Sequence, residues 1–149
     1  MCIIQDTREQ IPLDFSPYGI KTISKKLDTG DYTFLGLEDI ICIERKRNIC
    51  ELALNIGKDW IRFAKELDRM QTFQYRYIIC DFSSEDIDIY PNCVCVPKKY
   101  RKYIKIRPKF IHKRIEEIRS EYEIEFLFCG SSLQSEQVIM ELYDKLIQK

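Results

Sequence analysis

One short run constrains the fold of this chain more than any other: residues 40–46, which read Ile-Ile-Cys-Ile-Glu-Arg-Lys. The continuous apolar part of this run is typical of a strand buried on both faces. Side chains alternate between the two faces of an extended chain, so Glu44 and Lys46 should project to one side and Arg45 to the other. The run therefore predicts that Glu44 and Lys46 share one site at the end of a buried strand.

Asp31 is expected to reach the same site. It opens the segment 31–35, which can pair with residues 40–44 as a hairpin through the turn at 36–39. Two carboxylates would then converge on one cation, and Mg²⁺ is commonly held by one or two carboxylates together with water and substrate phosphate. Such an ion activates water and stabilises charge on phosphate, while Lys46 could orient or deprotonate the water. The spacing predicts a magnesium-dependent phosphodiesterase in which Mn²⁺ can replace Mg²⁺.

Each of these patterns also has a simpler interpretation when taken alone. Gly30-Asp31 is a common turn signal, and Glu44-Arg45-Lys46 is a common form of solvated charge run. The upstream segment Asp6-Thr7-Arg8-Glu9 could be a strand exit with a surface ion pair. Their occurrence together, in one order, favours the metal site.

The same residues resemble a known family. Asp6-Thr7-Arg8-Glu9, Leu27-Asp28-Thr29-Gly30-Asp31-Tyr32 and Ile43-Glu44-Arg45-Lys46 resemble the nuclease domain of the XPF-type structure-specific endonucleases. These belong to the restriction-endonuclease-like superfamily with a PD-(D/E)xK core. The resemblance covers residues 2–82, with a weaker match to the terminal strand and helix. It implies metal roles for Asp31 and Glu44, a catalytic role for Lys46, and supporting catalytic roles for Asp6, Arg8 and Glu9.

One position departs from the family pattern. The family usually has an aspartate four residues after the lysine, where this chain has Cys50, and an acid follows only at Glu51. Either Glu51 takes the catalytic role through a one-residue shift at the start of a helix, or the acid is dispensable. Asn48 is a plausible N-cap for that helix.

A basic segment lies far from these motifs. Residues 98–114 contain no acid, and Tyr100, Tyr103 and Phe110 are interleaved with the cations, which favours contact with phosphates and exposed bases. The alternative is a solvated basic helix or a patch for an anionic surface. The residues predicted to bind DNA are Arg45, Lys98, Lys99, Arg101, Lys102, Lys105, Arg107 and Lys109.

Composition sets wider bounds. The 149 residues fit one domain, 1–149, and a hydrophobic fraction of 45% can fill its core. The 24 basic and 24 acidic residues cancel, so net charge indicates no partner. No signal peptide or long apolar span is evident, which predicts an intracellular protein of the cytoplasm or nucleus without membrane contact.

The cysteines are odd in number, seven, which also favours an intracellular protein. Cys42, Cys80 and Cys129 lie in apolar runs and are expected to be reduced core residues. Cys93-Val94-Cys95 is tighter than a usual zinc knuckle and lacks a matching pair, which argues against structural zinc.

The order of elements predicts an α/β fold, a restriction-endonuclease-like sandwich with a central mixed β-sheet flanked by helices. Expected strands are 2–5, 20–27, 31–35, 40–45, 75–81 and 124–129. Expected helices are 48–57, 58–71, a short one near 83–86, one beginning at Pro108, and a last one entered through Ser131-Ser132. Residues 83–107 are otherwise expected to be mostly loop.

Three functions remain open from the sequence. The first is a metal-dependent DNA endonuclease that cuts branched, flapped or junction DNA in recombination, repair or replication. The second is a catalytically silent DNA-binding or scaffold subunit of a nuclease complex. The third is a phosphodiesterase for small nucleotides. The resemblance further implies a homodimer, through helices 108–121 and 132–147, or a helix-hairpin-helix partner protein. In its size, the chain is similar to small stand-alone family members encoded by viruses.

Overall fold

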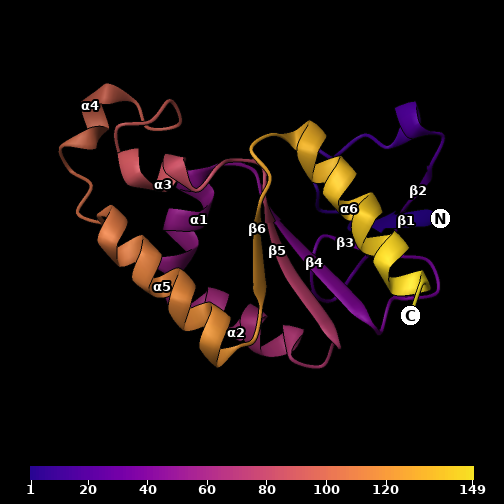
Figure 1. Cartoon of the computed structure of the whole chain (residues 1–149). Helices are drawn as coiled ribbons and strands as arrows, with labels where there is room; N and C mark the ends of the chain where they lie inside the picture. The colour runs from indigo at the N-terminus through magenta and orange to yellow at the C-terminus, as the bar shows by residue number, and fades with distance from the viewer.

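The computed structural model describes all residues, 1–149, and its centre is a six-stranded sheet with helices on both faces (Figure 1). The strands are β1 (Cys2–Gln5), β2 (Lys21–Ser24), β3 (Tyr32–Phe34), β4 (Ile41–Lys46), β5 (Tyr75–Cys80) and β6 (Glu125–Phe128). Their spatial order is β2-β1-β3-β4-β5-β6. β4, β5 and β6 are parallel, whereas β3 runs antiparallel to both of its neighbours. The sheet is therefore mixed, as predicted.

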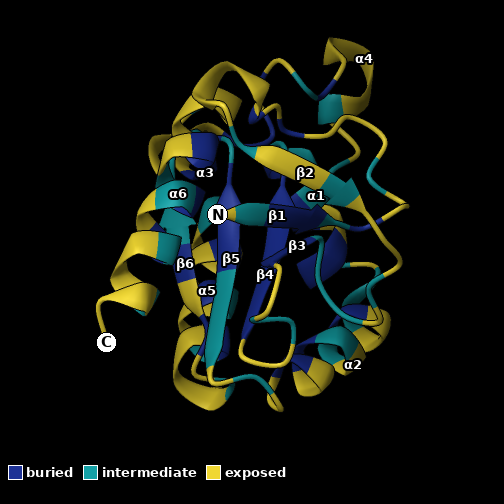
Figure 2. Ribbon diagram, turned by 90° about the vertical axis from the view of Figure 1, so that its right-hand side faces the viewer, coloured by how far each residue is buried: buried dark blue, intermediate teal, exposed yellow.

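The predicted hairpin forms between β3 and β4. Tyr32 pairs with Ile43, and the amide of Asp31 donates to the carbonyl of Ile43 at 2.8 Å. All six residues of β4 are buried, which agrees with its apolar run and with its place inside the sheet (Figure 2). The end of β4 thus brings polar side chains into a part of the molecule where charge is costly unless it is paired.

Helices form a layer on each face of the sheet. They are α1 (Ile49–Ile56), α2 (Trp60–Met70), α3 (Glu85–Ile89), α4 (Lys98–Arg101), α5 (Pro108–Glu121) and α6 (Ser132–Ile147), with a 3₁₀ turn, η1 (Ser16–Tyr18). Helices α1, α2, α3 and α5 lie on one side and α6 on the other (Figure 1). The α/β sandwich expected from the sequence is confirmed, although α4 and η1 were not expected.

Two apolar cores hold the layers together. The larger packs residues of α1, α2 and α5 against β5 and includes Leu52, Phe63, Ile118 and Ile78. The smaller joins Phe34 and its neighbours to α6. Burial of this kind stabilises a fold by about 25 cal/mol per Å² of apolar surface.

Local signals explain the helix boundaries. The side chain of Asn48 accepts a hydrogen bond from the amide of Glu51 at 2.9 Å, so the predicted N-cap of α1 is confirmed. Gly57 ends α1, and a Cβ there would collide with Ile106, which packs against the end of the helix. Strand β2 ends at Ser24, earlier than expected, because the amide of Leu27 turns to the carboxylate of Asp6 at 2.8 Å.

The cysteines follow the expectation in part. Cys42 and Cys80 are buried free thiols, and Cys129 is a half-buried one. Cys50 and Cys95 form a disulfide that the sequence did not indicate, because the two residues are 45 positions apart.

No helix combines the length and apolar character that crossing a membrane requires.

Candidate active site

Asp31 is fixed by backbone and side-chain contacts at the junction of three strands. Its carbonyl accepts from the amide of Asp6 at 2.8 Å, and its carboxylate Oδ2 accepts from the amide of Arg45 at 2.8 Å. Gly30 precedes it with a φ of 83°, and a Cβ at Gly30 would lie 2.6 Å from the sulfur of Cys42. Only glycine therefore allows this close approach of the Asp31 segment to β4.

Glu44 and Lys46 lie on the same side of β4, as alternation predicted. Lys46 Nζ is 3.8 Å from Glu44 Oε2 and 4.8 Å from the ring centroid of Phe63 on α2. Both side chains are buried, so their charges are weakly screened by solvent. The structure brings Glu44, Lys46 and Asp31 together at one site.

The electrostatics of this group favour a bound cation. Burial raises the pKa of Asp31 well above its usual range, and the negative charge of Glu44 raises it further. Burial alone would lower the pKa of Lys46, but Glu44 and Asp31 more than offset this, so the pKa of Lys46 is raised. Lys46 is therefore an ammonium group at neutral pH, and a bound cation would offset the cost of ionising Asp31 beside Glu44.

These residues border a polar hollow of about 360 Å³. Glu66 of α2 also lines it, and burial and the charge of Glu44 raise the pKa of Glu66. Asn55 of α1 lines it with a buried Oδ1 that has no hydrogen-bond partner in the protein. Neither residue was predicted from the sequence. Glu66 could have been found, because it lies three positions after Phe63 and four before Met70, a spacing that places all three near one helix face.

Glu51 lines the same hollow, whereas Cys50 forms a disulfide with Cys95 outside it. The carboxylate of Glu51 is 3.4 Å from Arg47 Nε, and its charge contributes to the raised pKa of Lys46. Glu51 therefore faces the hollow, as a shift of the family acid from position 50 to position 51 requires. Its catalytic role stays a prediction.

Asp6 and Arg8 form a support beside the site. Asp6 is 1% exposed, and its carboxylate accepts from Arg8 Nε at 2.7 Å and from the amide of Leu27 at 2.8 Å. Burial would raise the pKa of Asp6, but these hydrogen bonds outweigh it and lower the pKa. Asp6 thus holds β1 to the segment that leads into Asp31, while the exposed Arg8 lies at the rim of the hollow.

Arg45 does not have the position predicted for a DNA contact. Its side chain is 4% exposed and pairs with Asp81 at 2.7 Å and with Glu9 at 3.0 Å, on the other face of the sheet from Lys46. Asp81 in turn accepts from the hydroxyl of Ser135 on α6 at 2.6 Å. The alternation along β4 was predicted correctly, but the buried partners make Arg45 a structural residue. Glu9 belongs to the same network of ion pairs through its contact with Arg45.

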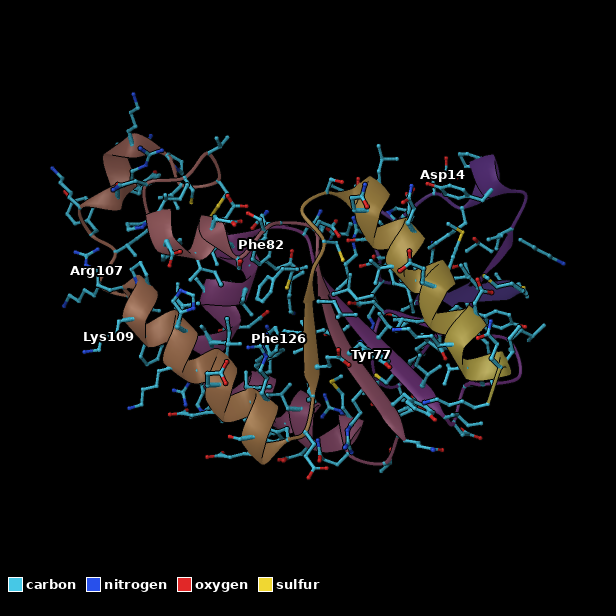
Figure 3. All side chains as sticks on the ribbon, in the orientation of Figure 1. Asp14, Tyr77, Phe82, Arg107, Lys109 and Phe126 are labelled. Atoms are coloured by element: carbon cyan, nitrogen blue, oxygen red, sulfur yellow. A yellow bond between two sulfur atoms is a disulfide. The ribbon has the colours of Figure 1, made fainter.

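The cations of the basic segment 98–114 fall into two groups: some are exposed to solvent, and others contact protein groups. Lys98, Lys99 and Lys102 are exposed on and after α4. A second hollow, of about 680 Å³, lies at the start of α5, where Arg107 and Lys109 point outward from the sheet (Figure 3). We call it the basic hollow, and its cations are Lys58, Lys105, Arg107, Lys109 and Lys113. Lys58 was not predicted as part of this surface, because it follows Gly57 and is distant in sequence from the basic segment 98–114.

Two arginines of the segment have structural contacts instead. Arg101 donates to the carbonyls of Val96 at 3.0 Å and Cys93 at 2.9 Å, which gives it a structural role, and its contact with DNA stays a prediction. The guanidinium of Arg114 lies 3.9 Å from the ring centroid of Trp60 and joins α2 to α5.

Comparison with known families gives one match that spans most of the chain. A family model described as the ERCC4 domain matches residues 5–142. A comparison with curated protein sequences gives no match.

Among solved structures, the chain is similar to XPF from Aeropyrum pernix, with a TM-score of 0.71 and 20% identity over 95% of this chain and 63% of that one. It is also similar to XPF from Aeropyrum pernix in a complex with DNA, with a TM-score of 0.72 and 20% identity over 99% of this chain and 65% of that one. The chain therefore spans less than two thirds of the XPF chains that it matches. At this identity the likeness establishes the fold.

The fold and the family match lead to the same assignment. The six-stranded mixed sheet places Asp31 and Glu44 together, and the ERCC4 match covers every residue of that site. The chain belongs to the ERCC4-domain family and has the fold of XPF.

Proposed function

We propose that this chain is a metal-dependent endonuclease that hydrolyses phosphodiester bonds in DNA. The observation that carries the proposal is the meeting of Asp31 and Glu44 beside Lys46 at the end of a buried strand, in a hollow open to substrate. Membership of the ERCC4-domain family supports it.

Asp31 and Glu44 are the residues proposed to hold Mg²⁺, or Mn²⁺ in its place. Their paired carboxylates are hard oxygen ligands. Burial, together with the charge of Glu44, raises the pKa of Asp31, and a bound cation would offset this cost to its ionised form. Bound there, the ion would activate water and stabilise charge on the scissile phosphate.

Lys46 is proposed to act as a cation and not as a base. Because its pKa is raised, its ammonium group can donate a hydrogen bond to the attacking water or to a phosphate oxygen. Its position over the ring of Phe63 restricts its movement. Glu51 and Glu66 line the same hollow and their charges contribute to the raised pKa of Lys46, and Glu51 is the candidate for the additional family acid.

The basic hollow supports DNA as the substrate in place of a small nucleotide. Helix α1 borders both hollows, with Leu54 and Asn55 in the catalytic one and Gly57 in the basic one. A small nucleotide bound at Asp31 would leave the cations beyond Gly57 unused, whereas a polymer can contact both. The complex of XPF from Aeropyrum pernix with DNA also supports this choice.

Branched, flapped or junction DNA is the substrate class that we propose, with a role in recombination, repair or replication. We also propose that a homodimer formed through α5 and α6, or a helix-hairpin-helix partner protein, assists binding. Light scattering of the purified chain should then give twice the monomer mass, or the monomer mass until the partner protein is added. A strict monomer at high concentration that cuts branched DNA unaided would contradict both forms of assembly.

Cleavage assays on duplex, flap, fork and four-way-junction DNA test the function. The wild type should cut with Mg²⁺ or Mn²⁺ and prefer a branched substrate, and Asp31→Ala and Lys46→Ala should abolish cutting while retaining DNA affinity. Asp39→Ala in the turn before β4 and Lys21→Ala on β2, both exposed and outside α5 and α6, are the matched controls. Binding without cleavage by the wild type would identify a silent subunit, and hydrolysis of small nucleotides alone would identify the third function.

A further inference from the structure

Three cysteines gather outside the catalytic hollow. Cys50 is the second residue of α1, and Cys93 and Cys95 belong to the loop between α3 and α4. Their sulfur atoms all lie within 4.8 Å of one another. Cys50 and Cys95 form the disulfide, and the sulfur of Cys93 is 3.3 Å from that of Cys95.

The third sulfur distinguishes this cluster from a simple disulfide. A disulfide needs two cysteines, yet the Cys93 thiol is buried against the pair and is only 8% exposed. The loop that presents it is fixed, because Arg101 donates to the carbonyls of Cys93 and Val96. The sulfurs of Cys93 and Cys95 are thus held side by side on a loop whose backbone Arg101 fixes in place.

The spacing and the charge suit a thiophilic metal. Tetrahedral zinc binds thiolates at about 2.3 Å, which separates neighbouring sulfurs by roughly 3.8 Å. The distance between Cys93 and Cys95 is near this value, and Cys50 needs only to move away from Cys95. Three thiolates on Zn²⁺ carry a net charge of about −1, and the amino end of α1 at Cys50 and the guanidinium of Arg101 lie where they offset it.

We propose that Cys50, Cys93 and Cys95 form a zinc site once the Cys50–Cys95 disulfide is reduced, with water as the fourth ligand. A dithiol reductant supplies two electrons and two protons to the disulfide and becomes a disulfide itself, which leaves three thiols. Zn²⁺ binding then releases their three protons as three Zn–S bonds form. The disulfide and the zinc-bound form exclude each other, because disulfide sulfurs are not thiolates.

The zinc site would tie the start of α1 to the loop that precedes α4. Cys50 lies four positions after Lys46, so the same short segment carries the proposed catalytic lysine and one zinc ligand. The site is built from sulfur atoms that the catalytic hollow does not contain. The zinc proposal and the proposed nuclease function therefore rest on different side chains, and either one can fail without the other.

Anaerobic titration with Co²⁺, a spectroscopic substitute for Zn²⁺, tests the site on the full chain. Here a phosphine replaces the dithiol as reductant: it becomes the phosphine oxide with oxygen from water, while the disulfide becomes two thiols. Reduced wild type should show a thiolate-to-cobalt charge-transfer band that saturates at one ion per chain and disappears on adding Zn²⁺. The oxidised chain should show no such band. Cys93→Ser should weaken binding at least about tenfold, whereas Cys129→Ser, which removes a half-buried thiol at the end of β6, should not change it.

Two results would overturn the proposal. One is the absence of a saturating band in the reduced wild type, which needs no variant to interpret. The other is an unchanged band in Cys93→Ser whose circular dichroism matches that of the wild type. Either result would leave a disulfide with a neighbouring thiol and no metal site.

Discussion

Arg45 and Asp81 form a buried ion pair in which the guanidinium Nη2 lies 2.7 Å from the carboxylate Oδ2, with side chains that are 4% and 6% exposed. The pair joins β4 to the end of β5, and the contact of Asp81 with Ser135 extends it to α6. It lies behind the strand that carries Glu44 and Lys46, so it fixes the position of the catalytic end of β4 from the opposite face.

Removal of the guanidinium should destabilise the fold. Arg45→Met leaves the carboxylates of Asp81 and Glu9, which are 6% and 14% exposed, without their cationic partner, and we expect a loss of about 3–5 kcal/mol in the free energy of unfolding. Urea denaturation followed by circular dichroism measures this. Arg119→Ala, which removes an exposed ion pair on α5, should cost less than about 1 kcal/mol. Equal losses in the two variants would refute the structural role of Arg45.

Substitution of Gly30 should destabilise the fold more than substitution of another glycine of similar conformation. Gly30→Ala adds a Cβ that meets Cys42 and the carbonyl of Ile43, in addition to the strain of its positive φ. Gly36→Ala has the same kind of strain, with a φ of 89°, and no neighbour within 4 Å. We expect Gly36→Ala to cost about 1–2 kcal/mol and Gly30→Ala clearly more.

The rates of DNA cleavage by Gly30→Ala and Gly36→Ala provide a second comparison of the two positions. Only Gly30→Ala should reduce turnover in protein that remains folded, because only it displaces Asp31. Thermal melts and single-turnover assays of both variants measure the two effects. Similar losses of stability and turnover in the two variants would show that the close approach at Gly30 does not matter.

Stability without metal should depend on pH through Asp31. Its pKa is raised in the folded chain, so the folded state holds this proton more tightly than the unfolded state does. The free energy of unfolding therefore falls as pH rises from the usual aspartate range through the folded-state pKa, and stays low above it.

Asp31→Asn cannot titrate and should abolish this loss. In a chelator, the variant should be more stable than the wild type above that folded-state pKa, and the advantage should vanish at low pH. Urea denaturation between about pH 3 and pH 9 measures it, with Asp144→Asn as the exposed control. A variant that is less stable than the wild type at the high end of this range would contradict the electrostatic account.

The basic hollow should contribute to DNA affinity through phosphate contacts. Lys58→Ala and Lys113→Ala should each weaken binding, and each lost contact should reduce the slope of log affinity against log salt by about 0.9. Fluorescence anisotropy at several salt concentrations measures the slope. Lys21→Ala, exposed on β2, should leave the slope unchanged. Unchanged slopes in Lys58→Ala and Lys113→Ala would contradict the prediction.

Much of the fold could be predicted because its signals are local. The apolar run before Glu44 identified the central strand, Asn48 identified a helix start, and Gly57 identified a helix end. Alternation along β4 also predicted correctly that Glu44 and Lys46 share a side. Periodicity and capping depend on neighbours within a few residues, which a single sequence contains.

The errors concern contacts between distant segments. Arg45 was expected on DNA because nothing near it in sequence shows that Asp81 and Glu9, each 36 residues away, would bury its charge. Cys50 was considered only as a missing acid, since Cys95 is 45 residues further on. Such partners are determined by how the sheet and helices pack, which local patterns do not encode.

The central claim is that Asp31 and Glu44 together hold the catalytic cation. Mn²⁺ titration by electron paramagnetic resonance, with DNA cleavage measured in the same samples, tests it most directly. Asp31→Asn and Glu44→Gln should each lose Mn²⁺ binding and cut at least about a hundredfold more slowly, a loss of roughly 3 kcal/mol in transition-state stabilisation. Asp39→Asn, exposed in the turn before β4, should behave as the wild type. Mn²⁺ binding and cleavage that survive in both site variants would contradict the claim.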